Sequence, residues 1–534
     1  MKTLKTVLPP VCVLFLFITI IIHESASITD PINPVLLSVT RNPETGNPPA
    51  TPKAPVAQEV HETESFDKIE TDAAKVGEHL IGSIAFDPSA LQDTSQETIQ
   101  FTFPTRSGYA SVKLNQGRSL SADQSSWQWT GVLDSVPFSA VSATRWKGHT
   151  FISVNGASVG IYELRQKGDG PMDVIHFNTS SLPACESEAD GLAHDYPHEH
   201  TDNDAVYDNF QNSEADEDTP SATTFIDVVI GYNDDARTNR GGTVGDPSDN
   251  GAVESRILGA VADANTTYSN SGLDLQMRVA WLGQIDYTAD PDVSFSVALS
   301  QLGNYSDGLA DELTAKKIEY QADFASLWIP SNVSGGRAYV LNASSSPDLA
   351  INVVRVQNPV STFVHEIGHN MGGRHIESSY GSSPSRWYSY SFAHQFSVSG
   401  TDYATVLCSF SDISSSNRIL YLSNPDINFL GEPTGVSNSA DMALTVQNNL
   451  DTYEGWFDTP ERLPDILEAG EGSYTITQNF GFVGETYQLL RTEDLSEPIE
   501  DWANVGSYSS DTNGDASASD SGAGAQSFYR WATE

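Results

Sequence analysis

The amino-acid sequence predicts an α/β (α+β) domain with a mixed sheet, preceded by a β-rich domain and followed by a small all-β module. Three patterns support this prediction. Residues 65–183 alternate short apolar and polar runs, residues 222–456 alternate strand-like and helix-like segments, and residues 460–534 are again strand-like. Of the 534 residues, 38% are hydrophobic and 10% aromatic, enough to form sizeable cores.

The charge balance excludes several classes of partner. The chain has 27 Lys+Arg against 71 Asp+Glu, a formal net charge of −44. Nucleic acids and anionic lipid surfaces attract basic proteins, so neither is an expected partner. Three cysteines are too few for a disulfide scaffold. We therefore expect an acidic, soluble monomer with no nucleic-acid partner and, in its mature form, no membrane partner.

The N-terminus has the parts of a secretory signal peptide. Lys2 and Lys5 precede the apolar run 11–22, and small residues follow at 25–27. The apolar run is shorter than the roughly 20 residues that span a bilayer, which argues against a membrane anchor. The sequence predicts cleavage of residues 1–27 and secretion of the mature chain.

The next two regions differ sharply in composition. Residues 28–185 form the predicted β-rich domain, with strand patterns at 98–103, 107–114 and 149–156. Residues 186–221 form a predicted acidic linker, with twelve Asp/Glu and no Lys or Arg. Such a segment buries too little apolar surface to fold alone, and exposed linkers are preferred protease sites.

The third region, residues 222–456, alternates between the two periodicities. TTFIDVVIGYND (223–234) has the apolar density of a buried strand, and ESRILGAVADANTTYSNSG (254–272) follows with helical spacing. Further strands are predicted at 273–287, 323–330 and 338–343, and further helices at 294–304, 309–321 and 360–373. Residues 460–534 read as the C-terminal β module, with strand patterns at 472–492 and 527–533.

One segment carries most of the chemical information: HEIGHNMGGRH, residues 365–375. His365 and His369 are four residues apart, so a helix places both imidazoles on one face, a spacing that suits zinc. Glu366 then lies beside the metal, where it can act on water. Gly372 permits a sharp turn, after which His375 can supply a third ligand and leave a fourth position open.

This segment resembles the H-E-x-x-H-x-x-G-x-x-H motif of the metzincin zinc endopeptidases. FIDVVIGYNDDAR (225–237) and residues 421–449 are similar to the opening and closing segments of the reprolysin-like (adamalysin-like) branch of secreted bacterial peptidases. The resemblance implies that His365, His369 and His375 bind one zinc ion and that Glu366 is the general base. It also implies a metzincin-type fold for 222–456, a propeptide upstream, and a possible calcium requirement.

Two positions depart from the family pattern. The methionine turn would be YATVLCSF (403–410), with Leu407 where the family has Met. Leu and Met are similar in volume, so the floor of the site can survive the exchange. Ile376 stands after the third histidine, where reprolysin-like enzymes have Asp.

Cys185 ends the predicted propeptide and allows three interpretations. A propeptide thiolate is a strong zinc ligand that could occupy the open position and keep a zymogen inactive. Alternatively, Cys185 is an ordinary partly buried thiol, or it forms a disulfide with Cys408.

The sequence therefore predicts a secreted zinc-dependent endopeptidase made as a zymogen, acting on proteins or peptides. An alternative is a secreted binding or adhesion protein built on an inactive metzincin scaffold. Hydrolysis that disappears with Glu366→Ala while zinc stays bound separates the two.

Overall fold

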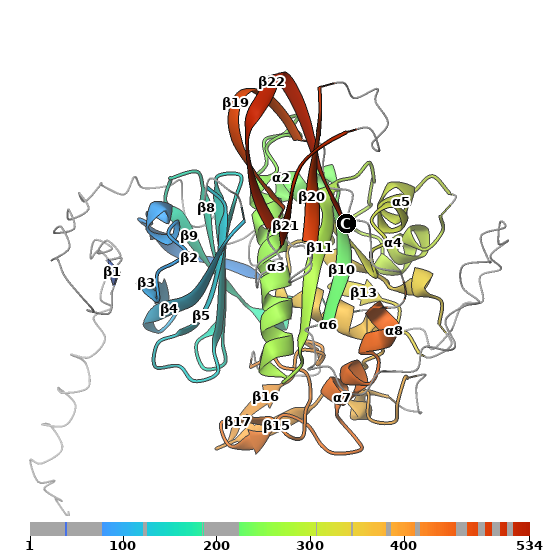
Figure 1. Cartoon of the computed structure of the whole chain (residues 1–534). Coiled ribbons are helices and arrows are strands. Elements are labelled where there is room, and N and C mark those ends of the chain that lie inside the picture. The colour runs from blue at the N-terminus through green and yellow to red at the C-terminus, as the bar shows by residue number, and fades with distance from the viewer. Residues whose placement is uncertain are drawn as a thin grey trace, which may run out of the picture. The chain divides into compact units, whose positions relative to one another are not determined.

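The computed structural model describes fourteen stretches of the chain (Figure 1). They are residues 38–39, 77–120, 125–183, 185, 224–305, 307–342, 345–380, 386–411, 417–454, 456, 467–478, 486–493, 502–509 and 516–533. The predicted signal peptide (1–27) and the predicted acidic linker (186–221) lie outside the described residues. In the described residues, no helix is long and apolar enough to span a membrane.

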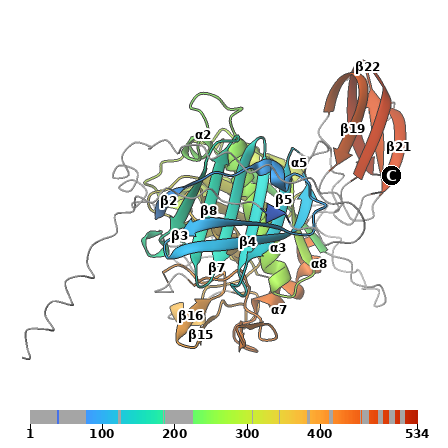
Figure 2. The same ribbon diagram turned by 90° about the vertical axis from the view of Figure 1, so that its left-hand side faces the viewer.

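The N-terminal region folds into an antiparallel sheet, which faces the viewer in Figure 2. Its strand order is β1-β3-β4-β5-β6-β7-β8-β9-β2. The buried indoles of Trp127 and Trp129 lie in its core, and Trp129 Nε1 donates to the carbonyl of Leu91 at 2.8 Å. The strands are β1 (Ser38–Val39), β2 (Glu78–Ile84), β3 (Ile99–Thr105), β4 (Gly108–Ser119), β5 (Trp127–Leu133), β6 (Ala140–Trp146), β7 (His149–Gly156), β8 (Gly160–Lys167) and β9 (Met172–Phe177).

The central region contains a second sheet, of order β11-β10-β12-β14-β13. Four strands are parallel and β13 is antiparallel at the edge. The inner strands are continuous apolar runs because helices and loops cover both faces. The strands are β10 (Thr224–Tyr232), β11 (Leu275–Gln284), β12 (Phe324–Ile329), β13 (Gly336–Ala338) and β14 (Ile351–Arg355).

The helices of this region are α2 (Asp234–Asn239), α3 (Gly251–Asn270), α4 (Phe295–Leu302), α5 (Asp311–Glu319), α6 (Ser361–Asn370), α7 (Met442–Gln447) and α8 (Leu450–Glu454). Two short ribbons complete it: β15 (Gln395–Val398) with β16 (Thr401–Ala404), and β17 (Asn428–Phe429) with β18 (Glu432–Pro433). The strand expected at 338–343 is instead β13, which ends at Ala338. The strand pattern at 351–355, which becomes β14, went unrecognised in the sequence.

The C-terminal region is a four-stranded antiparallel sheet of order β19-β22-β20-β21. Its strands are β19 (Leu467–Gln478), β20 (Thr486–Thr492), β21 (Ala503–Ser509) and β22 (Ala516–Thr533). Arg491 of β20 pairs with Asp520 of β22 at 2.6 Å.

Helix α3 joins the first two regions, because it packs against β6 and β7 on one side and against β11 and α6 on the other (Figure 1). Fifteen of its twenty residues are buried. A Cβ on Gly259 would lie 2.6 Å from the ring of Phe151, so glycine is what permits this close approach. Arg256 of α3 pairs at 2.5 Å with Glu163 of β8, and both side chains are 1% exposed.

Candidate active site

Helix α6 and the turn after it bring three imidazoles together. His365 and His369 lie one turn apart on α6, and Gly372, with φ +87°, turns the chain sharply so that His375 returns toward them. The Nε2 atoms of His365 and His375 are 3.0 Å apart, those of His365 and His369 3.1 Å, and those of His369 and His375 3.2 Å. Two ligands of a tetrahedral zinc at about 2.0–2.1 Å would be roughly 3.3 Å apart.

The surroundings of these histidines suit a cation. His365 Nδ1 lies 2.9 Å from the carbonyl of Val406, and His369 Nδ1 lies 2.8 Å from that of Gly373. Donation from Nδ1 to a carbonyl leaves the Nε2 lone pair facing the centre of the cluster. Burial, followed by the neighbouring imidazoles, lowers the pKa of His365 and His369 well below the usual value, so both are neutral. Lone pairs that converge from neutral imidazoles repel one another unless a metal ion accepts them, so this donor set fits zinc.

Glu366 lies beside the histidine cluster, in space that is free because Gly336 has no side chain. Its carboxylate is fully buried, and its Oε1 lies 2.1 Å from where a Cβ on Gly336 would be. Gly336 is the first residue of the edge strand β13. Any larger residue there would force the Glu366 side chain to move. This supporting role of Gly336 was not recognised in the sequence, although the Gly335-Gly336 pair was visible there.

Leu407, aligned in the sequence analysis with the methionine turn, is buried beside the histidine motif. Its side chain fills the space beside two glycines of the motif: a Cβ on Gly368 would lie 2.6 Å from Leu407 Cδ1, and one on Gly373 would lie 2.4 Å from Leu407 Cδ2. The preceding residue, Val406, supplies the carbonyl that orients His365. The segment that carries Val406 and Leu407 therefore contacts the histidine motif through one hydrogen-bonding carbonyl and one apolar side chain. Ile376, the second departure, packs partly buried against the core.

Cys185 lies at the same centre. Its Sγ donates to Glu366 Oε2 at 3.6 Å and lies 3.8 Å from His369 Nε2. One ligand atom each from Cys185, His365, His369 and His375 lies within 4.8 Å of the others. The backbone of Cys185 also forms an isolated parallel β-bridge with Gly336. Cys185 and Cys408 are not disulfide-bonded, and Cys408 Sγ donates to the carbonyl of His394 at 3.4 Å.

Three histidines from a helix and its following turn, with a glutamate beside them, define a site of the metallopeptidase class. The family model described as metallo-peptidase family M12, of the reprolysin type, matches residues 222–435. Residues 222–435 are therefore similar to the reprolysin-like metallopeptidases, the family that the sequence resembled.

Curated relatives agree with this classification. The chain is 28% identical over 200 residues to a protein named peptidyl-Asp metalloendopeptidase from Stenotrophomonas maltophilia, covering 37% of this chain and 46% of that one. It is 27% identical over 250 residues to a protein of the same name from Pseudomonas aeruginosa, covering 42% and 40%. The chain therefore spans less than half the length of these relatives.

Among solved structures, metalloproteinase-II from Bacteroides fragilis is similar over 54% of this chain and 85% of that one. Its sequence identity to this chain is 10% and the TM-score is 0.32.

Proposed function

We propose that this protein is a secreted zinc-dependent endopeptidase, made as a zymogen, that hydrolyses peptide bonds of extracellular proteins. The observation that carries the proposal is the convergence of three buried imidazoles on one point beside the buried carboxylate of Glu366. Residues 222–456 would be the catalytic domain, 1–27 the signal peptide, 28–185 the propeptide, 186–221 the linker cut on activation, and 460–534 an accessory module.

Each side chain has a defined part in this reaction. His365, His369 and His375 would hold the metal, with two of them fixed by the carbonyls of Val406 and Gly373. When bound, zinc supplies a Lewis acid that polarises the scissile carbonyl and acidifies water. Glu366 would accept a proton from the attacking water and then pass it to the leaving amine. Gly336 leaves the space in which the carboxylate is held for both transfers.

Cys185 would keep the zymogen inactive. Its Sγ lies close to both Glu366 and His369. As a thiolate it would occupy the fourth coordination position of the metal, which the catalytic water needs. Strands β6 and β7 of the N-terminal region also pack against helix α3. Cleavage within 186–221 and departure of the N-terminal region would then expose the site to substrate.

The relatives' names extend the proposal to specificity. Two of them are named peptidyl-Asp metalloendopeptidase. We propose that this chain, too, cleaves peptide bonds at aspartate.

The test compares the purified, secreted protein with its Glu366→Ala variant. Zinc would be measured by elemental analysis and casein hydrolysis with and without a chelator, before and after the N-terminal region is removed. We expect about one zinc in both proteins and hydrolysis only by the wild type, lost on chelation. Glu377→Ala is the matched control, because Glu377 is an exposed carboxylate two residues after His375.

Two outcomes would contradict the proposal. A wild type without zinc would show that the histidine cluster does not bind this metal. A zinc-bound wild type that cuts nothing after removal of the N-terminal region would favour a binding protein on an inactive scaffold.

A further inference from the structure

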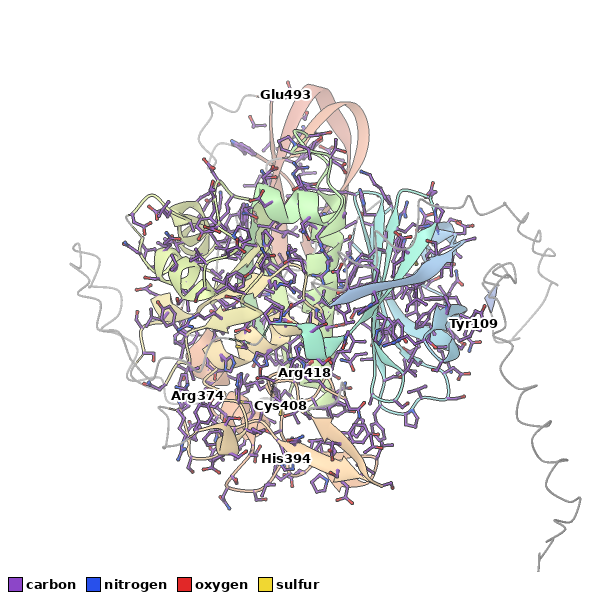
Figure 3. The ribbon with its side chains drawn as sticks, turned by 180° about the vertical axis from the view of Figure 1, so that it is seen from behind. Tyr109, Arg374, His394, Cys408, Arg418 and Glu493 are labelled. Carbon is purple, nitrogen blue, oxygen red and sulfur yellow. The ribbon has the colours of Figure 1, made fainter. Side chains whose placement is uncertain are left out.

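A pocket beside Glu366 contains a buried guanidinium group. Helix α6 contributes Thr362, His365 and Glu366 to its lining, and the chain after Leu407 contributes Ser409, Phe410 and Arg418. Figure 3 labels Arg418 close to Cys408, whose carbonyl accepts from its Nη1. The pocket is thus continuous with the site of bond cleavage, and Arg418 is one of its walls.

The hydrogen bonds of Arg418 leave part of its charge unmatched. Nη1 donates to the carbonyl of Cys408 at 3.3 Å and Nη2 to the hydroxyl of Ser361 at 3.0 Å. Nε is buried and donates to no acceptor in the described part of the chain. The guanidinium carbon lies 3.7 Å from the centre of the Phe410 ring, which holds the group in one plane. The whole residue is 2% exposed.

No ion pair between described residues includes Arg418, whereas Arg256, buried to the same degree, has Glu163 as its partner. Burial lowers the pKa of Arg418 to about 10, so the group still carries its charge at neutral pH. A buried charge without an ionic partner is unfavourable, and a carboxylate that entered the pocket would supply that partner.

We propose that Arg418 binds the side-chain carboxylate of the substrate and thereby selects aspartate next to the scissile bond. This inference rests on the proposed endopeptidase activity. A guanidinium offers a planar fork of N–H donors that matches a carboxylate, and the unused Nε lies in that fork. Pro183 and Cys185 of the N-terminal region also line the pocket, so a substrate side chain can occupy it once they have left.

The test uses the secreted, activated protein and pairs of fluorogenic peptides that differ only in Asp or Asn at one position. Mass spectrometry locates the cut bond. For the wild type we expect a kcat/KM about ten to a hundred times higher for Asp than for Asn. Arg418→Gln should remove this ratio mainly through the Asp peptide, and Arg418→Lys should retain part of it. Arg386→Gln is the matched control, since Arg386 lies over Phe392, outside the pocket lining.

The outcomes separate the two proposals. If the wild type cleaves both peptides equally, or if Arg418→Gln keeps the Asp-to-Asn ratio, the role of Arg418 is overturned while endopeptidase activity stands. If the wild type cleaves no peptide, the proposed function fails first. Zinc content and turnover of the Asn peptide show whether Arg418→Gln is folded, and the Lys variant decides if it is not.

Discussion

The interface between helix α3 and strands β6–β8, called the seam below, and the pocket beside helix α6 both contain buried charged groups. The two places differ in whether the buried charge has a partner within the chain. In the seam, Arg256 is neutralised by Glu163, which comes from the opposite region of the chain. In the pocket, Arg418 donates to a carbonyl and a hydroxyl and forms no ion pair with a carboxylate of the described residues, although Glu366 lines the same pocket. A charge matched within the chain stabilises one arrangement of the two regions, whereas a charge left unmatched is available to a ligand.

Glu163→Gln breaks the seam and has the largest expected effect on stability. Glu163 accepts from Arg256 and also from Arg165 at 2.6 Å, so the variant removes the carboxylate partner of Arg256 and one of the two carboxylates that pair with Arg165, the other being Glu78. We expect a loss of about 3–5 kcal/mol in the free energy of unfolding, measured by urea denaturation of the full chain. Asp169→Asn is the control: Asp169 is 82% exposed in its pair with Arg145, so we expect a loss below about 1 kcal/mol. A Glu163→Gln loss as small as the control's would show that the seam's ion pair contributes little.

Gly336→Ala perturbs the pocket side of the comparison without touching the seam. The added Cβ would displace the Glu366 carboxylate, and a misplacement of about 1 Å costs roughly a hundredfold in rate. We expect kcat/KM on casein to fall by about that factor while zinc content and the unfolding midpoint stay close to wild type. Gly303→Ala is the control, because its Cβ would meet no atom nearer than 3.4 Å. Unchanged kcat/KM in Gly336→Ala would mean that Glu366 is not held in place by this glycine.

Asp263 is a third buried ionisable group, and it lies in the seam. Its side-chain partners there are hydroxyl groups and not a charged side chain. It accepts from Ser142 at 2.7 Å and Ser153 at 2.8 Å, and burial raises its pKa to about 7. The neutral carboxyl therefore stabilises the folded chain fully below about pH 4, and this stabilisation is lost as the pH rises through 7. Measured as the difference in unfolding free energy between wild type and Asp263→Asn, we expect a fall of about 2 kcal/mol from pH 5 to pH 7. A difference that is flat or rises with pH would contradict the buried, protonated carboxyl.

The sequence predicted those parts of the site that depend on residues close together in the chain. The helix that carries His365 and Glu366 and the turn at Gly372 follow from residues close in sequence, whereas Leu407 was placed by the resemblance to the family. The sequence did not reveal the roles of Gly336 and Arg418, because each depends on a neighbour 30 or more residues away. The contact of Phe151 with Gly259 was missed for the same reason, since Phe151 is on strand β7 and Gly259 is on helix α3, far apart in the sequence.

The interpretation of Cys185 illustrates the same limit. Its position before an acidic segment left three interpretations open, which were a switch, an ordinary partly buried thiol and a disulfide with Cys408. The structure has no bond between Cys185 and Cys408 and places the Cys185 sulfur near His369, which favours the first interpretation. Trp387 packs against Tyr453 and Tyr388 stacks on Tyr390, and none of these rings lines the pocket beside Glu366.

The burial of α3 on two sides has a consequence for activation. If residues 186–221 are the linker cut on activation, as proposed, the uncut chain would hold the N-terminal region at α3 with an effective concentration on the order of millimolar. A single cut in the linker removes the tether but none of the contacts of Phe151, Glu163 and Ser142 with the helix. The released fragment would then act as a separate inhibitor that rebinds by mass action. The cut enzyme would become active on dilution, or when the fragment itself is degraded, and full activity would lag behind cleavage at high protein concentration.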